Sequence, residues 1–277
     1  MNRYIRQSLD LLLFSNIFIA LCAVAQGMVT YQLLQVKPDK YILALLFCST
    51  LALYNFRRVR WIFTHYRLTI TLTIISILSI IPLSFFLSSS SIILLAGLAL
   101  VSVSYSLPLF SFQEKRYSLR NIPGVKLFLI ASIWSLSCVL LPILEMESNN
   151  ETAITLNDTI ILIAKRFLFI AAITVPFDIR DLFQDKSNDL RTIPVVLGEK
   201  KALMFCQSLL AAYLILLFMF TDKPDANYFA LTLSTIITGW LIFKSEWEKD
   251  EYYYFLFLDG TMILQFFILF IFSTIHL

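Results

Sequence analysis

Long apolar stretches separated by short polar connections run through the whole chain. We place them at residues 8–35, 40–56, 67–87, 90–108, 122–144, 162–180, 200–220, 226–243 and 252–275. A helix of roughly 20 apolar residues crosses a hydrocarbon core of about 30 Å, and helices satisfy their backbone hydrogen bonds internally, as lipid requires. The pattern therefore predicts an all-α fold, a polytopic bundle of about nine transmembrane helices in a single domain over residues 1–277.

Composition supports this prediction and excludes some functions. The chain is 58% hydrophobic and only 15% charged, with 25 phenylalanines and a mean hydropathy of +0.78. Such a chain does not present a water-soluble surface, so we expect an integral membrane protein in contact with membrane lipids. The net charge of +3 is small and comes from the charged connections between spans. It therefore gives no support to nucleic-acid binding.

The basic residues alternate between the connections and predict the topology. With the N-terminus inside, 17 of the 22 lysines and arginines lie on the cytoplasmic side, as the positive-inside rule expects. The outer side keeps Lys37, Lys40, Lys165, Arg166 and Lys223. We therefore expect a bacterial inner (plasma) membrane protein with a cytoplasmic N-terminus and an outer C-terminus.

Four aspartates at the end of the sixth predicted span are candidates for chemistry. Asp178, Asp181, Asp185 and Asp189 recur at offsets of 3, 7 and 11, and on one helix they would share an arc of roughly 80°. Pro176 should kink the helix beside them. Hard cations such as Mg²⁺ take carboxylate oxygens, with substrate phosphates completing the site. The aspartates could instead pair with neighbouring basic residues in a solvated loop.

Other polar residues gather at the predicted cytoplasmic boundary. Asn55, Arg57 and Arg58 end the second span. The arginines could anchor the span in the interface. Alternatively, Asn55 and one or two of the arginines could face a cavity and hold an anionic group such as a diphosphate, since guanidinium suits phosphate. Tyr105 and Lys126 could face a cavity at the same end, although a boundary lysine commonly extends to the interface. Asn16, inside the first span, is expected to hydrogen-bond another helix.

These motifs resemble those of a known family. The pattern Arg180-Asp181-x3-Asp185, followed by Arg191-Thr192 and Gly198, resembles the second aspartate-rich motif of the UbiA superfamily of intramembrane prenyltransferases. Tyr105-Ser-x-Pro108 resembles that family's pattern after the fourth span. The agreement extends to the number of spans, the cytoplasmic N-terminus and the place of the acidic motif, and so covers essentially the whole chain.

The resemblance implies a helical bundle around a central, lipid-accessible cavity. It implies a prenyl transferase that uses Mg²⁺ to move a prenyl group from an isoprenoid diphosphate to a lipophilic acceptor. Asp181 and Asp185 would then be catalytic metal ligands, and Arg191 would contact the diphosphate. Asp178 and Asp189 would be further acids of the diphosphate site.

The first aspartate-rich motif of the family departs from its pattern here. Asn55 matches the asparagine of that motif, but Phe56, Val59 and Phe63 stand where its acids belong. Two hypotheses follow. In one, the chain is a divergent enzyme in which Arg57 or Arg58 replaces one metal ion at the diphosphate; in the other, it is a non-catalytic relative that binds an isoprenoid lipid or a partner protein.

Overall fold

The computed structural model describes residues 3–58, 66–107, 110–112, 115–117, 124–187, 190–221, 223–245 and 249–275. Most of this part of the chain is helical. The α-helices in chain order are α1 (Arg3–Phe14), α2 (Ile17–Leu33), α3 (Lys40–Arg58), α4 (Tyr66–Ser84), α5 (Ser89–Ser106), α6 (Val125–Ser135), α7 (Leu141–Ser148), α8 (Leu156–Arg180), α9 (Leu182–Ser187), α10 (Ile193–Leu197), α11 (Glu199–Met219), α12 (Ala226–Phe243) and α13 (Gly260–Ile275). Two π-helical turns, η2 (Leu136–Leu140) and η3 (Tyr253–Leu258), interrupt them.

Each apolar stretch predicted to cross the membrane contains helix. Among the described residues, six helical segments are long and apolar enough to cross a bilayer, and three shorter apolar helices take the places of the other predicted spans. The α-helical bundle expected from the hydrophobic pattern is therefore confirmed. The structure adds one element that the pattern did not predict, a short antiparallel hairpin of β1 (Phe110–Phe112) and β2 (Lys115–Tyr117) in the connection after α5, with Phe110 opposite Tyr117.

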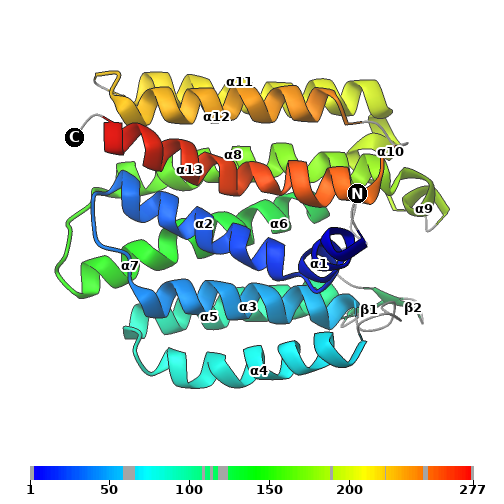
Figure 1. Cartoon of the computed structure of the whole chain (residues 1–277), viewed down its shortest axis with the longest axis horizontal. Helices are drawn as coiled ribbons and strands as arrows, with labels where there is room; N and C mark the ends of the chain where they lie inside the picture. The colour runs from blue at the N-terminus through cyan, green and yellow to red at the C-terminus, as the bar shows by residue number, and fades with distance from the viewer. Residues whose placement is uncertain are drawn as a thin grey trace.

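The long helices lie side by side as a bundle (Figure 1). Helix α8 packs against α6 and α11, while α2 packs against α3 and α13. The short helices α9 and α10, helix α1 and the β-hairpin gather at one end of the bundle, and α7 and the C-terminus lie at the opposite end (Figure 1). The last turn of α8, with Asp178, belongs to the first of these ends.

Large apolar side chains cover much of the outer surface. On α4, Ile74, Ile75, Leu78 and Ile81 are each more than half exposed, and similar side chains are exposed on α5, α11, α12 and α13. A water-soluble monomer rarely exposes so wide an apolar surface, whereas hydrocarbon tails accommodate it. The chain is therefore an integral membrane protein.

The first predicted span consists of two helices rather than one. Helix α1 ends at Phe14 and α2 begins after Asn16, whose backbone has a left-handed φ of 62°. Asparagine tolerates this conformation better than most residues. The Asn16 side chain donates a hydrogen bond of 2.6 Å to the amide oxygen of Asn55 on α3, which confirms the interhelical role expected for it.

Candidate functional site

Two aspartates and one lysine meet in the interior at the end of α8. The Nζ atom of Lys126, in the first turn of α6, lies 2.5 Å from Oδ1 of Asp178 and 3.7 Å from Oδ2 of Asp185. Both aspartate side chains are only 2% exposed, and the lysine side chain is 13% exposed. One ammonium group thus bridges two buried carboxylates.

The local chain path brings these two aspartates together. Helix α8 ends at Arg180 and α9 begins at Leu182, but the amide of Asp185 still donates to the carbonyl of Asp181 at 2.8 Å. The chain therefore keeps nearly helical spacing through the break. Residues seven apart lie about two turns along one face of a helix, so Asp178 and Asp185 reach the same ammonium group.

Asp181 turns away from this pair toward Arg180. The guanidinium of Arg180 donates from Nε to Oδ1 at 2.8 Å and from Nη2 to Oδ2 at 3.2 Å, a bidentate arrangement. The same guanidinium lies 5.3 to 5.6 Å from the ring centroids of Phe177, Tyr254 and Phe255. Ring faces and carboxylate together fix the orientation of Arg180 and, through it, of Asp181. The aspartates were predicted to share one helical face. In the structure Asp178 and Asp185 contact Lys126, whereas Asp181 contacts Arg180.

The remaining predicted residues occupy varied surroundings. Asn55 is fully buried, with its oxygen accepting from Asn16, and Tyr105 is buried near the end of α5. Arg191, between α9 and α10, is exposed. The side chains of Arg57 and Arg58, and Asp189, lie outside the described part of the chain. Their role in diphosphate binding stays a prediction.

The aspartates that meet Lys126 have the chemistry of magnesium ligands. In the described part of the structure, Asp178 Oδ1 and Asp185 Oδ2 are buried, and Lys126 is the partner found for both oxygens. Within the same residues, no three acidic, histidine or cysteine side chains form a metal-holding group. The chain thus offers a hard cation two carboxylates, which fits Mg²⁺ when substrate phosphates supply the other ligands.

The contact between Arg180 and Asp181 is one of the pairings with neighbouring basic residues that the sequence left open, whereas the burial of Arg166 was not anticipated. The aromatic rings of η3 beside the Arg180 guanidinium come from far along the chain, so no local signal predicts the orientation they give to this contact. Burial of Arg166 could have been inferred, because Thr155 and Asp158 form a helix start: Thr155 Oγ1 accepts from the Asp158 amide at 3.1 Å. With α8 beginning at Leu156, Arg166 lies well inside the span rather than at its boundary.

Comparison with solved structures identifies the fold. A UbiA homologue from Archaeoglobus fulgidus, solved with DMAPP and Mg²⁺, superposes with a TM-score of 0.66 at 13% identity, covering 96% of this chain and 98% of that chain. An apo UbiA homologue from Aeropyrum pernix K1 gives 0.62 at 13% identity, covering 95% and 98%. A digeranylgeranylglyceryl phosphate synthase structure gives 0.56 at 14% identity, covering 92% and 94%.

No protein-family model and no curated protein matches the sequence. At 12 to 14% identity, agreement over more than nine-tenths of each chain is agreement of fold. The resemblance drawn from the aspartate motif is confirmed at this level, and the chain has the fold of the UbiA superfamily.

Proposed function

We propose that this protein is a membrane-embedded prenyltransferase that transfers a prenyl group from an isoprenoid diphosphate to a lipophilic acceptor with Mg²⁺. The observation that carries the proposal is the buried group of Asp178, Asp185 and Lys126 at one end of the bundle. Structures of the same fold are described as bound to GPP and Mg²⁺ or to DMAPP and Mg²⁺. A diphosphate with an apolar tail suits a charged site that lies beside apolar helices.

The resemblance assigns the metal to Asp181 and Asp185. In this proposal Asp178 and Asp185 hold magnesium, because these two carboxylates meet in the interior, and Asp181 is a third acid positioned by Arg180. Magnesium, when bound, would neutralise charge on the diphosphate. Lys126 contributes a fixed positive charge to the same site, where it stabilises the charge that develops on the leaving oxygen. Arg191, and Arg57 or Arg58 in place of the acids missing from the first motif, are proposed as further diphosphate contacts.

The transfer requires one bond to break and one to form. The bond between the prenyl carbon and the diphosphate oxygen breaks with its electron pair on oxygen, and pyrophosphate leaves. The acceptor forms the new bond to that carbon and releases a proton. Apolar side chains around the site would exclude water, which would otherwise compete with the acceptor.

One observation favours a second function. The ammonium of Lys126 already neutralises Asp178 and Asp185, and the first motif contributes no acid at Phe56, Val59 or Phe63. A chain with this arrangement could be a non-catalytic UbiA-like protein that binds an isoprenoid lipid or a partner protein. It would then bind a prenyl diphosphate without releasing pyrophosphate.

The experiment that tests the proposal measures pyrophosphate release. Purified protein is incubated with labelled prenyl diphosphates, lipophilic acceptors and Mg²⁺. We expect release by the wild type and by Asp250→Asn, which changes an exposed acid, and none by Asp185→Asn. Binding of geranyl diphosphate without release would favour the second function, and equal release by Asp185→Asn would contradict the assigned site.

A further inference from the structure

Helix α8 carries a second buried cation far from the aspartates. Arg166 is only 6% exposed. It precedes Asp178 by twelve residues, about 18 Å along a helix, and lies ten residues after the first residue of α8. This places it inside the membrane-spanning part of the bundle, where an ionised side chain is costly unless an opposite charge or water accompanies it.

Arg166 has little polar contact with the chain. Its Nη2 lies 3.4 Å from Oγ1 of Thr30 on α2, a hydroxyl whose own hydrogen goes to the carbonyl of Cys138 at 2.7 Å. Its Nη1 is buried without a hydrogen-bond partner in the described ranges. No carboxylate of those ranges forms a salt bridge with Arg166.

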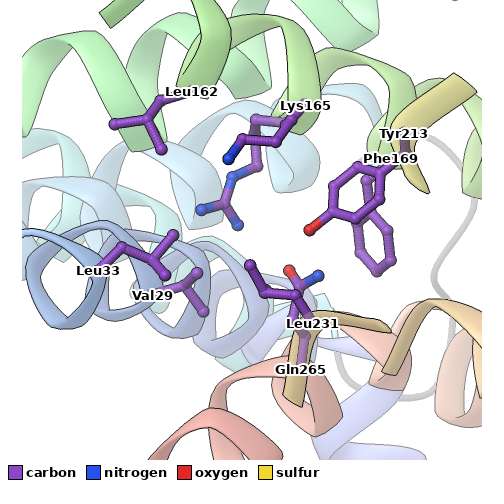
Figure 2. Close-up of a pocket in the computed structure, with 9 residues that line it drawn as sticks. Val29, Leu33, Leu162, Lys165, Phe169, Tyr213, Leu231 and Gln265 are labelled. Atoms are coloured by element: carbon purple, nitrogen blue, oxygen red, sulfur yellow. The ribbon is translucent and has the colours of Figure 1, made fainter. Parts of the chain in front are cut away.

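A small cavity of about 20 Å³ adjoins this guanidinium, and its other polar lining residues are Lys165, Tyr213 and Gln265. In Figure 2, Lys165 extends from α8, and the Tyr213 hydroxyl and the Gln265 amide face the same space. Gln26 donates to Oε1 of Gln265 at 3.3 Å, which orients the Gln265 amide. Its Nε2 is then a buried donor without a hydrogen-bond partner among the described residues.

The backbone that is hydrogen-bonded to Thr30, the partner of Arg166, is also unusual. Cys138, whose carbonyl accepts from Thr30, lies in the π-helical turn η2. Such turns are rare and occur frequently at functional sites. Here Arg166 donates to the hydroxyl of Thr30, which donates to the carbonyl of Cys138 in the turn. Hydrogen bonds therefore connect the buried cation to the irregular backbone.

Two cations on adjacent residues share this cavity, and no described acid forms a salt bridge with Arg166. Their mutual repulsion adds to the cost of removing a guanidinium from water, which is several kcal/mol for a buried ion. An anion in the cavity would relieve both costs. The volume suffices for a group of about the size of one water molecule, so phosphate and bulky carboxylates are too large.

We propose that this cavity binds one small monovalent anion of the size of chloride, held by Arg166 and Lys165 with Gln265 as a neutral donor. The anion joins α2, α8 and α13 near the middle of the bundle and stabilises their packing. This site is independent of the proposed transferase activity, because Arg166 lies about 18 Å along α8 from Asp178.

Bromide tests the proposal because it replaces chloride and can be located by its anomalous scattering. Full-length protein, purified in detergent and exchanged into gluconate, is heated in sodium bromide or sodium gluconate at equal ionic strength. We expect bromide to raise the unfolding midpoint saturably, by roughly 5 °C at a hundred times its Kd. A bromide-soaked crystal should show the ion in contact with Arg166 Nη1.

Matched variants separate this site from a general salt effect. Arg166→Gln should lose the bromide response, whereas Lys201→Gln, which removes an exposed lysine of α11, should keep it. If Arg166→Gln does not fold, Gln265→Leu serves instead and should weaken the response. Equal midpoints in bromide and gluconate, an unchanged response in Arg166→Gln, or a cavity filled by water or a lipid group would each overturn the proposal.

Discussion

The Nζ atom of Lys126 lies 2.5 Å from Oδ1 of Asp178. This buried contact joins the first turn of α6 to the last turn of α8, at the end of the bundle where α9 and α10 lie (Figure 1). Asp185 approaches the same ammonium at 3.7 Å. The lysine therefore separates two like charges that would otherwise face each other. Its removal should therefore change the free energy of unfolding.

We predict that Lys126→Met destabilises the protein by about 3 kcal/mol, because removing one partner of a buried pair leaves an uncompensated charge. Adding Asp178→Asn should recover part of the loss, since it removes one of the two carboxylates. The measurement is the free energy of unfolding in detergent for both single variants and the double variant. Strict additivity would show that the two side chains do not interact.

Arg180 is predicted to act through Asp181. Arg180→Lys keeps the charge but loses the bidentate contact and changes the cation–π contacts with Phe177 and Tyr254. Asp181 is the third acid beside the proposed magnesium ligands, and changing a residue that supports a metal site from outside its ligands typically costs about 10- to 100-fold in affinity or activity. We expect a rise of that order in the Mg²⁺ concentration for half-maximal pyrophosphate release. The exposed Arg67 provides the control variant Arg67→Lys, whose Mg²⁺ dependence should match the wild type.

Two substitutions at Asn16 distinguish the contribution of its side-chain hydrogen bond from that of its left-handed backbone conformation. Asn16→Gly loses the hydrogen bond to Asn55 but tolerates the φ of 62°, whereas Asn16→Leu loses the bond and adds left-handed strain of about 1–2 kcal/mol. Thermal unfolding should therefore rank the wild type above Asn16→Gly and Asn16→Gly above Asn16→Leu. Equal midpoints for the two variants would mean that backbone conformation contributes nothing.

Close packing of α2 against α3 depends on Gly27. A Cβ atom there would lie 2.7 Å from Leu46 Cδ1 and 3.2 Å from Leu43 Cδ2, whereas a Cβ at Gly97 would meet nothing within 4 Å. Gly27→Ala gains the same helix propensity as any glycine replaced inside a helix but forces the ends of two leucine side chains to move, so its net cost should be about 1 kcal/mol. Gly97→Ala should gain about 0.5–1 kcal/mol from improved helix propensity. Opposite shifts of the unfolding midpoint are the expected result.

The predicted topology places the two ends of the bundle on opposite sides of the membrane. Ser148, at the end of α7, and Ser187, at the end of α9, are both exposed. In intact cells, a membrane-impermeant maleimide should label Ser148→Cys, while Ser187→Cys should require permeabilisation. The reverse pattern would place the N-terminus outside.

The hydrophobic pattern by itself determined where the membrane helices lie, because lipid accepts only backbone that satisfies its own hydrogen bonds and every span must be apolar over its length. It also located the acidic motif, through the aspartates at helical spacing that end the sixth span. Asn16 as an interhelical donor was equally accessible, since a polar residue inside a span has few partners except other helices.

Tertiary structure decided which charges meet. Lys126 and Asp178 are 52 positions apart, and only the packing of α6 against α8 brings them into contact. The same packing divides the aspartates, because η3 presents aromatic rings that hold Arg180 against Asp181. Periodicity places side chains on one face of one helix, whereas the partner of a buried charge is set by whichever other helix covers that face.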